Sequence, residues 1–182
     1  GGSIGSELCR QIAALKPAHL VLLENSEYNL YALEMEFTDR FPAVRLTAIL
    51  GDVRDAARVE QVFLSQQPNV VFHAAAYKHV PMLENQLREA LHNNVLGTRN
   101  VALAADRHGC SEFVLISTDK AVNPANIMGA SKRVAEIFCQ NLNQRSTTRF
   151  ITVRFGNVLG SDGSVVPLFK TQIENGGPVT VT

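Results

Sequence analysis

Residue types that can transfer protons stand together after an apolar run of the sequence. Thr118, Asp119 and Lys120 directly follow the run EFVLIS, which is typical of a buried β-strand. Downstream, Met128 and Lys132 are four residues apart, which places their side chains on the same face of a helix. Hydroxyl, carboxyl and amine groups at the mouth of a strand are suited to general acid–base chemistry when their pKa values match the task.

A second group of candidate residues opens the chain. Gly2 and Gly5 precede a helical pattern with the spacing of the last two glycines of a phosphate-binding fingerprint, so Gly2, Ser3, Ile4 and Gly5 are expected to contact a pyrophosphate at the helix N-terminus. Glu24 ends the next strand about 20 residues later. Its carboxylate would accept from ribose hydroxyls and repel a 2′-phosphate, which favours NAD over NADP. A glutamate simply exposed at a strand end is the alternative.

Further cofactor contacts are expected where later strands end. Asp52 and Val53 in GDVRD suit the edge of an adenine, although Asp52 or Asp55 could equally cap the following helix. His73 is interpreted as a packed strand residue, and Ser117 as a cofactor contact at the mouth of its strand. Side chains small enough for a flat cofactor to lie against the backbone follow His73: Ala74, Ala75 and Ala76.

These candidates require a scaffold that brings strand ends together. Strands are expected at 19–24, 44–50, 69–75, 112–117 and 149–156. Helices are expected near 5–15, 26–40, 55–66, 85–108 and 128–144. The alternation predicts a Rossmann-like α/β fold with a doubly wound parallel sheet, whose ligands bind at the carboxyl ends of the strands. We expect truncation at both ends: an NAD-binding domain over 1–156 lacking its first strand, and the loop-rich start of a substrate-binding region over 157–182.

The composition excludes several classes of function. With 46% hydrophobic residues, 19% charged residues and zero formal net charge, the chain is typical of a soluble globular protein and has no basic excess for nucleic acid. Its apolar runs are too short to span a bilayer, so no membrane contact is expected from the chain itself. Cys9, Cys110 and Cys139 are odd in number and widely spaced, which argues against a disulfide framework or a metal site and indicates a reducing compartment.

Taken together, the motifs resemble the nucleotide-sugar 4,6-dehydratase branch of the short-chain dehydrogenase/reductase superfamily, in its large, membrane-anchored, polysaccharide-biosynthesis type. The resemblance covers essentially the whole chain and is carried by GGSIGSELCRQI, ENSEYNLY, HAAAYKHVPMLE, NNVLGT, STDKAVNPANIMGASKR and RFGNVLGSDGSVVPLF. It implies an NAD-dependent UDP-N-acetylglucosamine 4,6-dehydratase that oxidises sugar C4, removes water across C5–C6 and returns the hydride to C6. The resemblance further implies a homo-oligomer, with the complete protein anchored in the bacterial inner membrane and acting at its cytoplasmic face.

That chemistry assigns roles to the residues around the predicted strand mouth. Asp119 is expected to be the acid at the C6 hydroxyl and Lys120 the base at C5. At position 128 the superfamily usually has a tyrosine, and a thioether has no proton to relay. Because the large-type dehydratases share this methionine, Met128 is expected to pack against sugar or nicotinamide. Thr118 would then relay the C4 hydroxyl proton to Asp119 or water, and Lys132 would hold the nicotinamide ribose and lend positive charge.

The resemblance also assigns residues to the substrate: Lys78, Pro81, Asn94, Asn157 and Ser161. An exposed loop lysine is the alternative for Lys78. Asn94 could support Lys132 through water, or could simply hydrogen-bond within its own helix. For Arg154, a diphosphate contact and a structural ion pair are equally consistent with its place in a strand.

Two other functions stay open from the sequence alone. One is an epimerase or reductase of the same superfamily, although these reactions have no elimination that would need Asp119 and Lys120. The other is a catalytically silent, NAD-binding scaffold, which the absent tyrosine permits and the retained Thr118, Asp119, Lys120 and Lys132 argue against.

Overall fold

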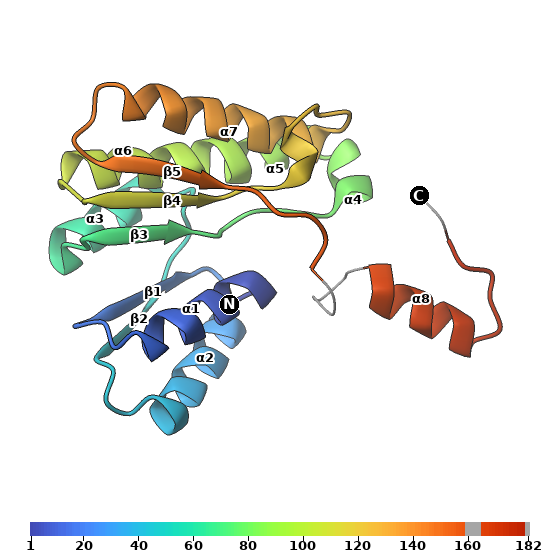
Figure 1. Ribbon diagram of the computed structural model, residues 1–182, viewed down its shortest axis with the longest axis horizontal. Helices are drawn as coiled ribbons and strands as arrows, with labels where there is room; N and C mark the ends of the chain where they lie inside the picture. The colour runs from blue at the N-terminus through green and yellow to red at the C-terminus, as the bar shows by residue number, and fades with distance from the viewer. Residues whose placement is uncertain (159–164, 181–182) are drawn as a thin grey trace.

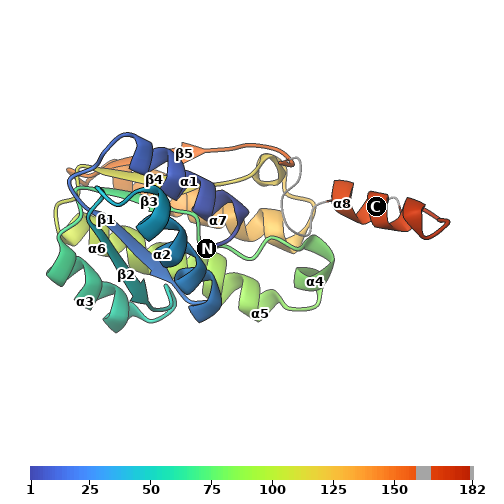
Figure 2. The same cartoon turned by 90° about the horizontal axis from the view of Figure 1, so that it is seen from below.

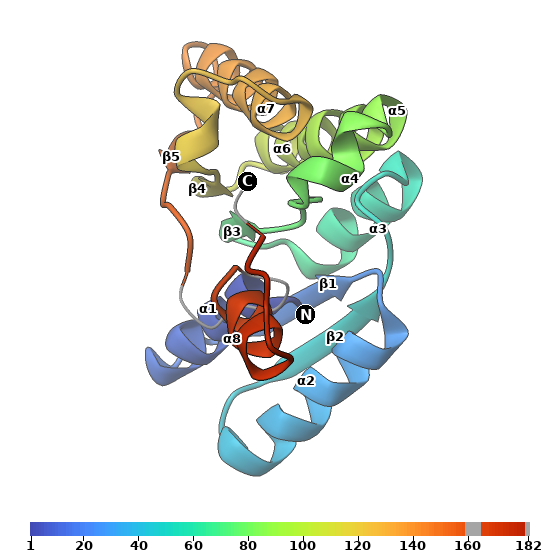
Figure 3. The same ribbon diagram turned by 90° about the vertical axis from the view of Figure 1, so that its right-hand side faces the viewer.

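The computed structural model of the chain describes residues 1–158 and 165–180. The strands within these residues are all parallel and form two hydrogen-bonded sheets, β1–β2 and β3–β4–β5 (Figure 1). Their bounds are β1 (Leu20–Glu24), β2 (Leu46–Leu50), β3 (Val70–His73), β4 (Glu112–Ile116) and β5 (Arg149–Val153). The two sheets lie side by side, with β1 next to β3, and their carboxyl ends point the same way (Figures 1 and 3).

Helices cover both faces of this arrangement. The helical segments are α1 (Ser3–Ala14), α2 (Glu27–Arg40), α3 (Ala56–Gln66), α4 (Val80–Glu84), α5 (Leu87–Ala90), the π-helix η1 (Leu91–Gly97), α6 (Thr98–Arg107), the 3₁₀ turn η2 (Asp119–Ala121), α7 (Ile127–Asn143) and α8 (Val165–Glu174). α1 and α2 lie on one side of the strands, and α3, α6 and α7 on the other (Figure 3). The predicted doubly wound, Rossmann-like architecture is therefore confirmed. No helix in residues 1–158 or 165–180 is both long and apolar enough to cross a membrane.

Local signals in the sequence explain where three of the helices begin. The side chains of Ser26, Asp55 and Asn126 accept hydrogen bonds from backbone N–H groups three residues ahead, and so cap α2, α3 and α7. Of the two aspartates considered for the start of the third helix, Asp55 is the cap. Asp52, which follows the carboxyl end of β2, is therefore not the cap of this helix.

Two apolar clusters hold the layers together. The first packs α1 and α2 against β1 and β2, and its buried members include Leu20, Leu22, Leu30, Leu33 and Phe37. The second lies between the β3–β5 sheet and α3, α6 and α7, and includes Val59, Phe63, Phe113, Leu115 and Cys139. All three cysteines, which lie in the described part of the chain, are free thiols.

Some predicted elements differ from the structure. The region after residue 157 contains a helix, α8, rather than only loops. Pro167 is compatible with this helix because it falls in the first turn, where no helical hydrogen bond needs its nitrogen. The single helix predicted over 85–108 consists of α5, a wide π-helical turn and α6, and the short α4 precedes it. α4 and α5 lie at the end of the molecule toward which the strands point, with α8 farther out (Figure 2).

Candidate functional site

The predicted acid–base residues meet at the carboxyl end of β4. The Thr118 hydroxyl donates to Asp119 Oδ1 at 3.0 Å, and Lys120 Nζ donates to the same oxygen at 3.2 Å and to Asn157 Oδ1 at 3.1 Å. The Asp119 side chain is 56% exposed and that of Lys120 is 35% exposed. The structure thus joins residues from η2 and from the segment after β5 into one hydrogen-bonded set that a ligand can reach.

The electrostatics of this set give Asp119 a definite charge. Hydrogen bonds from Thr118 and then from Lys120 lower the pKa of Asp119, against a small opposing effect of burial. The carboxyl group is therefore ionised near neutral pH. An acid must first acquire a proton, so Asp119 can donate one only after it has accepted one.

Lys132 lies beneath these residues. Its side chain is on α7, the residue is only 4% exposed, and Nζ donates to the Ile116 carbonyl oxygen at 2.7 Å. Burial lowers the pKa of Lys132 to about 8, although the negative charge of Glu136 works in the opposite direction. Lys132 is thus a buried cation at the last residue of β4.

Met128 is a packing residue, with protein neighbours. It is 5% exposed and forms a cluster with Leu83 of α4 and Ala90 of α5. Beside this cluster, the Glu84 carboxylate accepts from the backbone N–H of Ile127 at 2.8 Å. Met128 therefore helps to fasten α4 to the first turn of α7; a contact with sugar or nicotinamide stays a prediction.

Asn94 lies inside the protein rather than at its surface. It is fully buried; its Oδ1 accepts from Tyr77 N at 2.8 Å, and its Nδ2 donates to Tyr77 O at 3.0 Å and to Ser131 Oγ at 2.9 Å. Its amide therefore ties the segment after β3 to α7, so these hydrogen bonds reach outside its own helix and differ from the alternative of bonding within that helix. Lys78 and Pro81, the other predicted substrate residues of this region, are exposed.

The predicted cofactor residues line the carboxyl ends of β1 and β2 and the start of α1. Among the residues that the structure describes, no side chain caps the N-terminus of α1, and a Cβ added at Gly2 or Gly5 would meet nothing within 4 Å. Glu24 accepts from Ser26 N at 2.9 Å and from the Gly1 amino group. The backbone at this helix end is therefore open to close approach by a ligand.

The remaining predicted cofactor residues differ in exposure. The Asp52 carboxylate is held by the Arg54 guanidinium, whose hydrogen bonds lower the pKa of Asp52 despite the opposing effect of burial. Val53 is 9% exposed and belongs to the second apolar cluster. The three alanines after β3, Ala74, Ala75 and Ala76, are partly exposed.

Sequence reasoning missed Glu136. This residue is fully buried on α7, where it accepts from the hydroxyl of Ser117 at 2.5 Å and pairs with Arg154. Arg154 therefore makes the structural ion pair considered above, and the Ser117 hydroxyl is bonded within the protein. The signal was present, since Glu136 follows Met128 and Lys132 at helical spacing on the buried face of α7.

Other expectations have simpler outcomes. His73 is 3% exposed, its Nε2 lies 3.0 Å from Thr98 Oγ1, and burial lowers its pKa to about 3, which confirms a packed, neutral strand residue. Ser161, assigned to the substrate, lies outside the described residues. Among residues 1–158 and 165–180, no three His, Cys, Asp or Glu side chains gather as a metal site would require.

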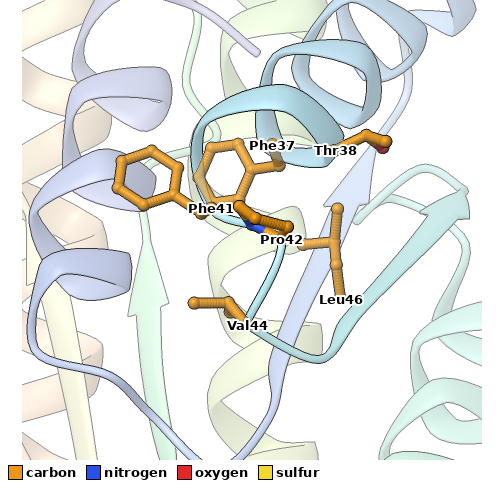
Figure 4. A pocket seen from close by; sticks show the side chains of 6 residues that line it. All are labelled: Phe37, Thr38, Phe41, Pro42, Val44 and Leu46. Carbon is orange, nitrogen blue, oxygen red and sulfur yellow. The ribbon is translucent and has the colours of Figure 1, made fainter.

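A hollow elsewhere on the protein lacks polar groups suited to this chemistry. It measures about 220 Å³ and is lined by Phe37, Thr38, Phe41, Pro42, Val44 and Leu46 (Figure 4). These residues lie where α2 ends and β2 begins, whereas the acid–base residues follow the carboxyl end of β4. The hollow is therefore not part of the candidate site.

Known proteins resemble the chain over its whole length. The sequence profile of the family described as "Polysaccharide biosynthesis protein" matches residues 1–182. A probable polysaccharide biosynthesis protein, EpsC of Bacillus subtilis, is 53% identical over 183 residues, which cover 100% of this chain and 31% of the relative. The chain thus corresponds to about a third of that relative.

One of the relatives is named for an enzymatic activity. The UDP-N-acetylglucosamine 4,6-dehydratase (inverting) of Campylobacter jejuni is 37% identical over 173 residues, covering 92% of this chain and 50% of that enzyme. The X-ray structure of Pen from Bacillus thuringiensis superposes with a TM-score of 0.88 and 38% identity, covering 100% of this chain and 55% of Pen.

Proposed function

The chain belongs to the family of polysaccharide biosynthesis proteins, and we propose that the protein that carries it dehydrates UDP-N-acetylglucosamine, or a closely related UDP-N-acetylhexosamine, to its 4-keto-6-deoxy derivative with NAD as cofactor. Membership of this family confirms the resemblance drawn from the sequence motifs. The observation that carries the proposal is the hydrogen-bonded set of Thr118, Asp119, Lys120 and Asn157 at the carboxyl end of β4. The dehydratase among the relatives supports the choice of reaction.

Asp119 first acts as an acceptor in this proposal. Oxidation at C4 releases the proton of the C4 hydroxyl, and the Thr118 hydroxyl, which already donates to Asp119 Oδ1, can pass that proton on. Because Asp119 begins ionised, it can take up the proton. The protonated carboxyl group then donates it to the C6 hydroxyl, which leaves as water.

Lys120 handles the proton at C5. The ketone at C4 acidifies that proton, and the Lys120 amine accepts it during the elimination. Hydrogen bonds to Asp119 and Asn157 fix the direction of the Lys120 side chain. The ammonium group returns a proton to C5 as C6 is reduced, so one water leaves and each side chain recovers its starting state.

The residues around α1 fit a dinucleotide. The uncapped N-terminus of α1 and the open space at Gly2 and Gly5 suit a pyrophosphate, and the Glu24 carboxylate at the end of β1 suits ribose hydroxyls. When bound, NAD would accept a hydride from C4 and return it to C6. Lys132 supplies a buried positive charge at the carboxyl end of β4, where it would hold the nicotinamide ribose.

Several features of the complete protein belong to the proposal. Lys78 and Pro81 contact the substrate from the loop after β3, and residues 157–182 begin the substrate-binding region. The complete protein is a homo-oligomer anchored in the bacterial inner membrane, with this domain on the cytoplasmic face.

One incubation tests the activity. The full-length protein is mixed with UDP-N-acetylglucosamine that carries deuterium at C4, and the product is followed by NMR and mass spectrometry. A 4-keto product with deuterium at C6 supports the proposal. A C4 epimer with no loss of water would indicate an epimerase instead, and bound NAD without any product would indicate a silent scaffold.

A further inference from the structure

The buried carboxylate of Glu136 accepts hydrogen bonds from three different side chains, which is more than a simple ion pair needs. Its Oε1 accepts from Ser117 Oγ at 2.5 Å and from Arg154 Nε at 2.9 Å. Its Oε2 accepts from Arg154 Nη2 at 2.6 Å and from Arg133 Nη1 at 3.1 Å. The Glu136 side chain is 0% exposed, whereas those of Arg154 and Arg133 are about one third exposed. Glu136 is thus the buried centre of a polar cluster.

The cluster joins the segments that directly follow two neighbouring strands. We call these segments the exits: residues 117–120 after β4 and residues 154–157 after β5. Ser117 follows β4 and Arg154 follows β5, and the same stretch carries two backbone hydrogen bonds, from Ser117 N to Val153 O at 2.7 Å and from Asp119 N to Phe155 O at 3.1 Å. The ladder between β4 and β5 therefore continues past both strands, up to Asp119.

The two exits also approach closely beyond this point. A Cβ added at Gly156 would lie 3.4 Å from Asp119 Oδ2, so the segment after β5 packs directly on that carboxylate. The Asn157 side chain, the next one along, accepts from Lys120. The relative position of the two exits therefore decides where Asp119 and Lys120 point.

The same helix face grips the exit of β4 a second time. Lys132 lies one turn before Glu136 on α7 and donates to Ile116 O, next to the residue that Glu136 holds. Buried ion pairs contribute little net stability compared with apolar residues of the same volume, but they do select one arrangement over others in some proteins. A positional role thus accounts for the cluster better than a role in stability.

We infer that Glu136 is a positioning residue which, through Arg154 and Ser117, fixes the exits of β4 and β5 so that Thr118, Asp119, Lys120 and Asn157 form a single site. Its catalytic consequence rests on the proposed function. The geometry that it fixes does not, because the hydrogen bonds among the two exits can be measured without substrate.

The kinetic test uses the full-length protein and three substitutions. Glu136→Gln keeps the shape of the side chain and removes its charge, and we expect kcat to fall about 100-fold, since small misplacements of reacting groups have effects of this size. KM for UDP-N-acetylglucosamine and retention of NAD are expected to stay near wild type. Arg154→Lys keeps the positive charge but loses the bidentate contact with Glu136, so its kcat is expected to lie between those of wild type and Glu136→Gln.

Arg133→Gln is the matched control. Arg133 contacts the same carboxylate, but it comes from α7 itself and, within the described part of the chain, joins no second element. Its kcat is therefore expected to stay within about twofold of wild type. Equal losses for Arg133→Gln and Glu136→Gln would overturn the inference, as would a wild-type kcat in Glu136→Gln.

Hydrogen exchange supplies a readout that needs no activity. In Glu136→Gln, the amides of Ser117 and Asp119 are expected to exchange faster, while those of β1 and β2 keep their wild-type rates. Unchanged exchange at the two exits, or faster exchange throughout, would overturn the inference. If the wild-type protein forms no 4-keto product, the proposed function fails, and exchange still decides whether Glu136 positions the exits.

A smaller substitution covers the case in which Glu136→Gln does not fold. Ser117→Ala removes only the hydroxyl that donates to Glu136. Faster exchange confined to the two exits, with NAD retained, supports the inference. Wild-type exchange in this variant contradicts it.

Discussion

The two halves of the molecule differ in what they bury. In residues 1–50 the buried side chains are apolar except for Ser6, and the ionic contacts lie near the surface, as between Arg10 and Glu36. In residues 70–158 a polar layer lies beneath the strand ends. Its buried members are His73, Asn93, Asn94, Thr98, Ser117, Ser131, Lys132 and Glu136.

This difference matches the tasks of the two halves under the proposed function. A dinucleotide can be held by backbone groups and by shape, which an apolar core supports sufficiently. Proton transfer needs side chains in fixed positions. Buried polar groups hold such positions when all their hydrogen bonds are made, but the fold loses stability if any one partner is removed. Under this proposal, the half that contains the acid–base residues therefore also carries buried polar residues, which form their hydrogen bonds within the chain.

The largest expected effect comes from the exposed part of the catalytic half. Asp119→Asn removes the group that first accepts and then donates a proton, and we expect dehydration to slow by about 10²–10⁴-fold. NAD binding should be unchanged, because Asp119 lies outside the α1–β1 region. The rate of 4-keto product formation and the stoichiometry of bound NAD check this, with Asp39→Asn on α2 as the control. A variant that kept the wild-type rate would remove Asp119 from the mechanism.

The buried polar layer predicts a large effect on stability. Asn94→Ala leaves the backbone N–H and C=O of Tyr77 without the partners that they have in the wild type. At roughly 1–3 kcal/mol for each orphaned group, the free energy of unfolding should fall by about 4 kcal/mol. Urea unfolding measures the loss, and the exposed Asn141→Ala on α7 is the matched control, with an expected change of less than about 0.5 kcal/mol. Similar losses in both variants would contradict a special role for buried amides here.

Local signals predicted much of this molecule. Helix caps such as Ser26 and strand ends such as Glu24 are encoded within a few residues, and the four-residue spacing correctly placed Met128 and Lys132 on one face of α7. What could not be predicted depends on partners distant in the chain. Asn94 and Ser131 are 37 residues apart, and nothing local indicates that they bond.

The same reasoning explains what the sequence did not reveal at the candidate site. Ser117 is 19 residues from Glu136, so nothing local indicates that its hydroxyl donates to that carboxylate, and a cofactor contact of Ser117 stays a prediction. Helical periodicity marks Glu136 as a buried position, but a charge there acquires meaning only once Arg154 is seen beside it. Sequence thus identifies which residues gather at the strand ends, and tertiary structure decides which of them remain accessible.

Lys132 provides a test by pH. Its pKa in the folded chain is about 8, below the ordinary 10.5, because burial outweighs the attraction of Glu136. Between these pH values the unfolded chain binds more protons than the folded one, so the free energy of unfolding rises with pH from about 8 to 10.5. Below pH 8 the destabilisation caused by burying the Lys132 cation is present in full. The titratable groups that raise the pKa of Lys132 are Glu136 and Cys139 on α7. The charge of Lys132 in turn helps to lower the pKa of His73 on β3.

The comparison with Lys132→Met isolates this contribution. Relative to the variant, the free energy of unfolding of the wild type should rise by about 3 kcal/mol across that interval. Urea unfolding at several pH values measures both proteins, and their other groups titrate alike. A difference that stays constant with pH would show that Lys132 titrates normally and is not a buried cation.

The smallest effect is expected in the apolar half, where Glu36 of α2 pairs with Arg10 and Arg40 near the surface. The hydrogen bond from Arg10 is the largest influence on Glu36 and lowers its pKa, so the pair stabilises the fold above the ordinary pKa of a glutamate and loses this effect as pH falls. Glu36→Gln should nevertheless cost about 1 kcal/mol or less, and less still at high salt, because water screens the charges. Urea unfolding at two salt concentrations checks this, with Glu34→Gln as the control, since Glu34 forms no ion pair with the described residues. A loss as large as that of Asn94→Ala would mean that surface ion pairs hold this half together as firmly as buried amides hold the other.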